Sequence, residues 1–185
     1  FRDTGEEQAL KMADRTLEAM YRGGIYDHIG GGFCRYSTDK MWLVPHFEKM
    51  LYDNALLLWA YADAYMLTGR PLFGFAGEST ADYVLRELTG PDGGFYSSQD
   101  ADTGGEEGGF YTLTPSEIKA TLGEEDGRRF CEWFDITERG NISGKSIPNL
   151  IHNPEFEDEP EEISLLRHKI YEWRLQRAKP GLDDK

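Results

Sequence analysis

The chain is 185 residues long, which is enough for one domain with its own hydrophobic core. Hydrophobic residues make up 39% of the sequence and charged residues 29%, a composition that excludes a disordered chain. The formal net charge of -14 argues against partners such as nucleic acid or an anionic membrane, because both need a basic patch. No apolar stretch is long enough to cross a bilayer, and the first residues do not form a signal peptide. We therefore expect a cytoplasmic protein.

The two cysteines, Cys34 and Cys131, lie far apart and form no C-x-x-C motif. They predict neither a disulfide framework nor a zinc site, and the sequence gives no reason to expect a metal or another cofactor. The chain lacks an initiator Met and ends in a charged segment. These features favour an internal part of a longer protein.

Apolar residues recur with helical spacing in six segments. Helices are expected over residues 6–22, 46–67, 72–88, 115–122, 125–134 and 161–179. The second is apolar on most of its sides, which predicts burial between other helices, and Pro45 is suited to open it. Two predicted helices are each followed by a similar tetrapeptide, Gly-Gly-Ile-Tyr ending at Tyr26 and Gly-Gly-Phe-Tyr ending at Tyr96. This weak repeat indicates an array of helical hairpins with short β-hairpin loops.

The first polar cluster surrounds three consecutive glycines and includes Tyr26, His28, Arg35 and Tyr36. Glycines allow a close approach of the backbone or a positive φ angle, but the spacing matches no phosphate-binding motif. Two interpretations stay open. The loop either binds a ligand, with His28 handling protons and Arg35 anchoring a substrate, or it is a tight turn whose polar groups bond neighbouring loops.

The second cluster contains Trp42, His46, Glu48, Lys49 and Asp53. Helical spacing would bring His46, Lys49 and Asp53 close to one face. A histidine in the first turn of a helix tends to stay neutral, because the positive end of the helix dipole disfavours imidazolium. A neutral imidazole can accept or relay a proton. A buried polar network between helices is the alternative.

The third cluster contains Tyr96, Gln99, Asp100 and Asp102. Two nearby carboxylates can act as acid and base, as in glycoside hydrolysis. The start of this segment also imitates a calcium-binding loop, but Tyr111 stands where the closing Glu should be. The third interpretation is an acidic turn in which the Asp side chains cap local amides.

Three longer blocks carry a specific resemblance: GGIYDHIGGGF at 23–33, RYSTD at 35–39 and WLVPHFEKMLYDNA at 42–55. With GFYSSQDAD at 94–102 and EEG at 106–108, they resemble the YyaL family of thioredoxin-domain-containing proteins, which includes a mammalian spermatogenesis-associated member. The family usually has His where this chain has Cys34.

The resemblance implies an (α/α)6 toroid similar to N-acylglucosamine 2-epimerases and six-hairpin glycosidases. Residues 1–185 would then be a single all-α domain, the N-terminal half of that toroid. The full-length protein would add a thioredoxin-like domain as a partner and the later hairpins. Epimerases of the related superfamily use histidines as acid and base, so analogy of fold makes His28 and His46 candidates.

Two main hypotheses about function follow, and whether the chain is an enzyme stays open. In the first, the cleft binds or converts a small sugar, as an epimerase, isomerase or hydrolase. The catalytic candidates are His46, His28, Asp100 and Asp102. The substrate-binding candidates are Arg35, Tyr26, Tyr36, Trp42, Glu48, Asp53, Tyr96 and Gln99.

In the second hypothesis the toroid is a noncatalytic platform that presents protein clients to the thioredoxin-like domain. A purely structural role of the polar motifs is a third interpretation. A half toroid exposes helix surfaces that further hairpins would cover, so self-association is also expected.

Overall fold

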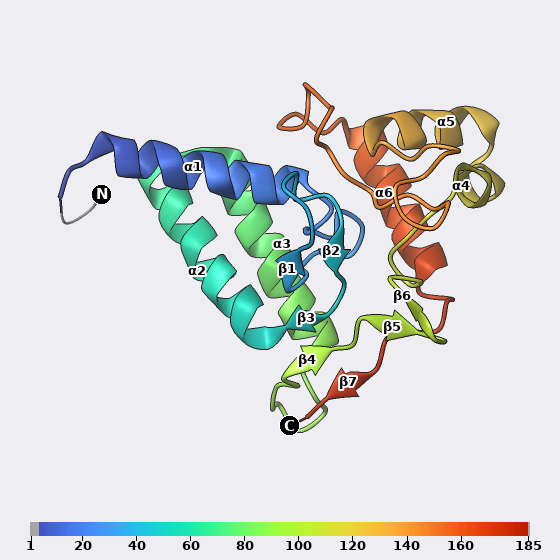
Figure 1. Ribbon diagram of the computed structural model, residues 1–185, viewed down its shortest axis with the longest axis horizontal. Helices are drawn as coiled ribbons and strands as arrows, with labels where there is room; N and C mark the ends of the chain where they lie inside the picture. The colour runs from blue at the N-terminus through green and yellow to red at the C-terminus, as the bar shows by residue number, and fades with distance from the viewer. Residues whose placement is uncertain (1–3, 185) are drawn as a thin grey trace.

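The computed structural model describes residues 4–184, which form six helices joined by loops and two-residue strands (Figure 1). The helices are α1 (Glu7–Arg22), α2 (Leu51–Thr68), α3 (Pro71–Glu87), α4 (Pro115–Leu122), α5 (Glu124–Trp133) and α6 (Glu161–Arg174). The strands are β1 (Tyr36–Ser37), β2 (Pro45–His46), β3 (Lys49–Met50), β4 (Ser98–Gln99), β5 (Asp102–Thr103), β6 (Glu106–Glu107) and β7 (Leu182–Asp183). The protein is therefore helix-rich, with small antiparallel sheets.

The six predicted helices are confirmed in order, but two of their ends were predicted wrongly. α2 begins at Leu51 and not at residue 46, because β2 pairs with β1 and β3 pairs with β4. The prediction that His46, Lys49 and Asp53 share a helix face is therefore wrong. α6 ends at Arg174 and not at residue 179.

Local sequence explains where several of these helices start. Thr114 and Glu117 form a capping box at the start of α4. The Thr114 hydroxyl accepts a hydrogen bond from the amide of Glu117, and the Glu117 carboxylate accepts one from the amide of Thr114. Pro115 and Pro71 stand in the first turns of α4 and α3, where a missing N–H costs no hydrogen bond. The starts of these two helices can therefore be predicted from the local sequence.

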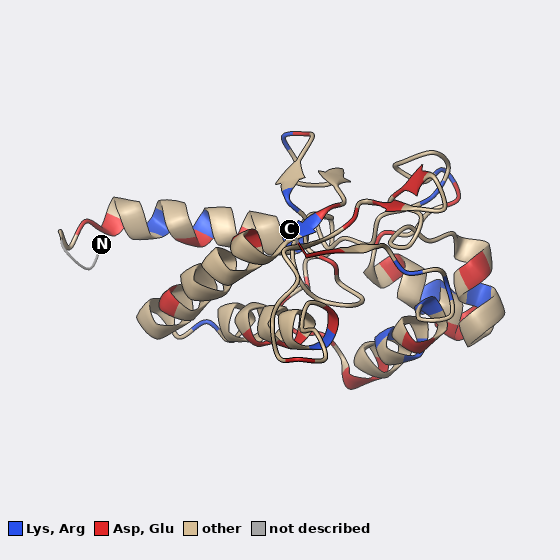
Figure 2. Ribbon diagram, turned by 90° about the horizontal axis from the view of Figure 1, so that it is seen from below, with Lys and Arg blue, Asp and Glu red and all other residues tan. Residues whose placement is uncertain are grey.

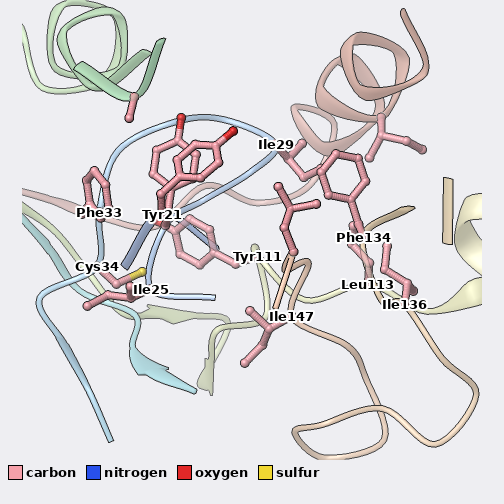
Figure 3. Packing of buried hydrophobic residues seen from close by; sticks show 14 of the residues in the cluster. Tyr21, Ile25, Ile29, Phe33, Cys34, Tyr111, Leu113, Phe134, Ile136 and Ile147 are labelled. Carbon is pink, nitrogen blue, oxygen red and sulfur yellow. The ribbon is translucent and has the colours of Figure 1, made fainter. Parts of the chain in front are cut away.

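The helices form two groups with the strands between them (Figure 1). α2 packs along α3 and contacts α1, while α4 contacts both α5 and α6. One cluster of buried hydrophobic side chains includes residues of both groups. Figure 3 shows Tyr21 of α1, with Ile25 and Phe33 of the loop that follows it, in the same cluster as Phe134 and Ile147, which follow α5. The two groups therefore share one hydrophobic core.

The glycine run at residues 30–32 permits close packing onto α3 and α6. A Cβ atom on Gly30 would overlap the guanidinium of Arg174, and one on Gly32 would overlap the ring of Tyr83. Gly32 also has a φ angle of 77°, in the left-handed region that suits glycine. The glycines thus bring the loop after α1 against two helices, and no ligand is needed to explain them.

A buried ion cluster joins that loop to β3 and α6. Arg174 donates two hydrogen bonds of 2.8 Å to the Asp27 carboxylate, and Lys49 donates one of 2.9 Å. Lys49 also donates to the carbonyl of Gly31 at 2.8 Å. The side chains of Lys49 and Arg174 are only 1% and 2% exposed. Both buried cations are therefore bonded to the same carboxylate inside the protein.

The charges in this cluster change one another's protonation. Burial alone would raise the pKa of Asp27, but Arg174 and Lys49 outweigh burial and hold that pKa well below its usual range. Burial lowers the pKa of Lys49 against the attraction of Asp27. Asp27 therefore stays ionised at neutral pH, and its two cations depend on that charge.

Replacing Asp27 by Asn should lower the free energy of unfolding by about 3–5 kcal/mol, because two buried cations lose their counter-charge. Urea denaturation at neutral pH measures the change. The matched control is Glu132→Gln, which removes an exposed pair with Arg128 and should cost less than about 1 kcal/mol. Equal losses in the two variants would show that the cluster does not stabilise the fold.

Candidate functional site

The candidate site is built on the extended segment of residues 45–50, whose side chains alternate between two sides. Phe47 and Lys49 are buried, and Lys49 reaches the ion cluster. His46 and Glu48 lie on the other side and are partly exposed. Because the inward side chains are fixed in the core, the outward pair is held in a defined position.

The imidazole of His46 lies between two carboxylates. Its Nδ1 atom is 2.8 Å from Glu107 Oε1, and its Nε2 atom is 3.7 Å from Glu48 Oε2. Since a carboxylate only accepts, Nδ1 donates to Glu107. Tyr36, which pairs with His46 across β1 and β2, stacks its ring on the imidazole at 5.1 Å between centroids. Nε2 is then the nitrogen that can accept or release a proton.

A guanidinium completes the surface cluster. Arg35 donates a hydrogen bond of 2.9 Å to Glu48, and its backbone amide donates to the carbonyl of Glu48 at 2.7 Å. The hydrogen bond to Glu48, followed by the neighbouring Tyr52, raises the pKa of the Arg35 guanidinium. Burial raises the pKa of Asp53 and Glu48 adds to the rise, while Arg35 opposes it. Among the described residues, Asp53 Oδ2 is buried without a hydrogen-bond partner.

Glu107 reaches His46 from the hairpin of β5 and β6. Its Oε1 atom also accepts a hydrogen bond from the amide of Phe47 at 3.4 Å. The neighbouring Glu106 is bound by Lys145 at 2.8 Å, which fixes the hairpin from its other end. Sequence reasoning did not name Glu107 as a site residue. The acidic pair within a recognised sequence block was the available signal, but only the folded hairpin brings it to His46.

The structure brings together part of the predicted set. The predicted site residues that meet in this cluster are Arg35, Tyr36, His46, Glu48 and Asp53. Together with Glu107 and Tyr52 we call them the His46 cluster. It contains a proton carrier, several carboxylates, a guanidinium and two partly exposed tyrosines. These groups are the ones that bind hydroxyl groups and transfer protons.

Three predicted residues lie in the interior instead. Tyr26, His28 and Gln99 are 2%, 4% and 4% exposed. His28 Nε2 is 3.2 Å from the carbonyl of Gly23, and Gln99 accepts hydrogen bonds from two buried tyrosine hydroxyls. Burial lowers the pKa of His28 to about 4, with the Gly23 carbonyl opposing the change. Their surroundings are those of core side chains, as expected from the interpretation in which these polar motifs have a structural role.

Trp42 and Tyr96 lie outside the His46 cluster. Trp42 has a left-handed backbone with a φ angle of 61°, and its carbonyl accepts the amide of Ile25. Its side chain lines a surface pocket of about 280 Å³ together with Arg15 and Lys40. Tyr96 is half-buried at the base of β4, where its amide donates to the carbonyl of Leu88.

Asp100 and Asp102 are both exposed. The amide of Asp102 donates to the Asp100 carboxylate at 3.4 Å, as in an acidic turn. Asp102 pairs with Glu107 across the hairpin, so it adjoins the His46 cluster at its edge. Asp100 stands one step further away, with its amide bonded to Gly181.

Three further features of residues 4–184 bear on the predictions from the sequence. Within that range, no three His, Cys, Asp or Glu side chains gather in a way that would hold a metal ion. None of the helices in the same range combines the length and the apolar character needed to cross a bilayer. Cys34 and Cys131 are separate buried thiols.

Comparison with known proteins gives several relatives, while no family model matches. Spermatogenesis-associated protein 20 of Homo sapiens is 36% identical over 96% of this chain, and that of Mus musculus is 39% identical over 77%. An uncharacterised protein of Caenorhabditis elegans is 34% identical over 97%. These matches support the predicted family. The chain spans 27%, 20% and 29% of the length of these three relatives, so it corresponds to a part of each.

The neutral, buried His28 should make stability depend on pH. Its pKa is about 4 in the folded state and about 6.5 when unfolded, so below pH 6.5 only the unfolded chain takes the proton. The stability that the neutral imidazole provides is present above pH 6.5 and falls by about 1.4 kcal/mol per pH unit down to pH 4. Urea denaturation at pH 7, 6 and 5 measures this slope.

The control for this prediction is His28→Gln, which keeps a donor for the Gly23 carbonyl but does not titrate. Its slope between pH 6.5 and pH 4 should be smaller than that of the native chain by the stated amount. Identical slopes would show that His28 takes up protons equally in both states.

Proposed function

We propose that the His46 cluster binds a carbohydrate and acts on it by acid–base chemistry in the longer protein. The observation that carries this proposal is the position of the His46 imidazole between Glu107 and Glu48, at a partly exposed surface. Buried polar networks satisfy their groups inside the protein, whereas the side chains of His46 and Arg35 are 29% and 43% exposed and can meet a ligand. The predicted toroid would supply the remaining walls of the cleft.

The contacts assign a role to each group. Glu107 accepts the Nδ1 proton, which orients the ring and stabilises imidazolium when Nε2 takes a proton from the substrate. Arg35 offers donors for sugar hydroxyl or carboxylate oxygens. Tyr36 already stacks on His46, and its exposed ring is a surface on which a sugar ring can lie.

Asp53 and Glu48 extend this chemistry to hydrolysis. The pKa of Asp53 is raised by burial, whereas Glu48 is ion-paired with Arg35. Carboxyl groups in such different environments can divide the tasks of acid and base. Isomerisation needs only one group that removes a proton and returns it, whereas epimerisation also needs a second acid on the opposite face of the sugar. Isomerisation is therefore the reaction class that the cluster supports best.

A thermal-shift screen of the longer protein against monosaccharides, disaccharides and uronic acids tests the proposal. A ligand that binds only the folded state raises the melting temperature, with about 2.7 kcal/mol of stabilisation at a hundred times Kd. The shift should be lost in His46→Gln and Glu107→Gln. It should persist in the control Glu106→Gln, which alters the same hairpin but pairs with Lys145.

A flat screen at millimolar sugar would contradict sugar binding and favour the hypothesis of a platform for protein clients. A shift that survives both His46→Gln and Glu107→Gln would place the sugar elsewhere on the protein.

A further inference from the structure

A surface pocket beside the C-terminal half of α1 is basic, although the chain as a whole is acidic. α1 carries basic as well as acidic residues along its length (Figure 2). Asp and Glu outnumber Lys and Arg by 34 to 20 in the chain, whereas this pocket of about 280 Å³ is lined by three cations and one carboxylate. The cations are Arg15, Arg22 and Lys40, the carboxylate is that of Glu18, and Trp42 lines the pocket with its ring. We call it the Trp42 pocket.

The positive charge of the pocket is only partly compensated. Within residues 4–184, the exposed side chains of Arg15 and Lys40 take part in no ion pair or hydrogen bond. Arg22 is fixed in place, because its guanidinium donates to two backbone carbonyls. The carboxylate of Glu18 is shared between Arg22 at 3.4 Å and Arg70 at 2.9 Å. Two free cations therefore stand beside a third that is held rigidly.

The aromatic wall of the pocket has a strained backbone. Trp42 has a φ angle of 61°, in the left-handed region that bulky residues rarely adopt. The carboxylate of Asp39 accepts three backbone amides of the same turn, at 2.6–3.2 Å, and so fixes the turn. A Cβ atom on Gly23 would overlap the carbonyl of Trp42, so glycine is needed where this turn meets the end of α1. Strain that is held by its surroundings is typical of binding sites.

We propose that the Trp42 pocket binds the phosphate group of a small molecule that also carries a ring. A phosphate monoester bears up to about two negative charges and offers three strong acceptor oxygens. Two free cations beside a fixed guanidinium supply the matching charge and donors. The ring would lie against Trp42, which also packs against the hydrophobic core. The proposal goes beyond the proposed function and does not depend on it.

The size and charge of the pocket argue against other anionic partners. Its volume is close to the lower end of the range for small-molecule sites, about 300 Å³. A nucleic acid spreads its phosphates along a strand and needs an extended basic surface, which a net charge of -14 disfavours. The same net charge repels anions from most of the surface, so binding depends on the local cations. A carboxylate has only one charge and would leave part of them unused.

Isothermal titration calorimetry with phenyl phosphate, on the same protein as the sugar screen, tests the proposal. Arg15→Gln combined with Lys40→Gln should weaken binding at least about tenfold, because two charged donors are lost. The matched control combines Arg139→Gln with Lys169→Gln, which removes two exposed cations elsewhere and changes the net charge equally. The control pair should bind phenyl phosphate like the native protein. Thermal melting checks that each variant is folded.

Two further ligands identify the chemistry that the pocket recognises. Inorganic phosphate should bind more weakly than phenyl phosphate, because it has no ring to place on Trp42. Benzoate has a ring but only one charge, and it should also bind more weakly. Trp42→Gly suits the left-handed backbone and removes the aromatic wall, so it should abolish the advantage of phenyl phosphate over inorganic phosphate.

Equal weakening in the two pairs of variants would overturn the proposal, because net charge alone would then explain the effect. No saturable binding of phenyl phosphate at millimolar concentration would also overturn it. Benzoate binding as tightly as phenyl phosphate would refute the assignment to phosphate. None of these probes is a sugar, so the outcome is independent of the sugar screen.

Discussion

The neutralisation of one buried carboxylate holds three distant parts of the chain together. Asp27 follows α1, Lys49 belongs to β3 and Arg174 ends α6, and the carboxylate and the guanidinium are 147 positions apart in the sequence. Removing charges from water is costly, so the cluster is stable only while all three side chains stay in contact. The core of apolar residues brings the two helix groups together, and this ion cluster fixes how the loop, the strand and the helix meet.

The same constraint positions the His46 cluster. Because side chains alternate along an extended segment, fixing Lys49 inward fixes Glu48 outward, and fixing Phe47 inward fixes His46 outward. Gly108 reinforces this arrangement, since its missing side chain leaves room for the ring of Phe47 beside the hairpin that carries Glu107. Side chains that stabilise the fold thus lie on one side of residues 45–50, and side chains with candidate chemical roles lie on the other. A change at Lys49 is expected to disturb both.

Much of the fold could be predicted, because helical periodicity and capping are local. The start of α4 at Pro115 follows from residues within one turn. The segment before Leu51 could not be predicted, since Pro45 suits a helix start and only pairing with Tyr36–Ser37 makes it a strand. That pairing depends on contacts between segments that no local rule connects.

In the candidate site, too, some residues could be predicted from the local sequence and others could not. His46, Glu48 and Arg35 were found because polar groups gathered in neighbouring blocks. His28 belonged to the same pattern, but its surroundings are apolar and aromatic, with the rings of Tyr21 and Tyr26 against its own. Residue type alone does not separate an imidazole at the surface from one in the core. Glu107 was missed because its distance from His46 is set by a hairpin and not by spacing along the chain.

The composition of α2 bears on both the fold and the candidate site. A helix that is apolar on most sides encodes burial on most sides, and residues 4–184 satisfy that demand along one face only. Leu56, Trp59 and Met66 are exposed within residues 4–184, so apolar composition alone did not predict which sides of this helix are buried. Because Tyr52 on this helix lies beside Arg35, the exposed apolar surface adjoins the cluster proposed to bind sugar. The groups of that cluster are held in position from the other side of residues 45–50, where Lys49 is bonded to Asp27 and Asp27 to Arg174.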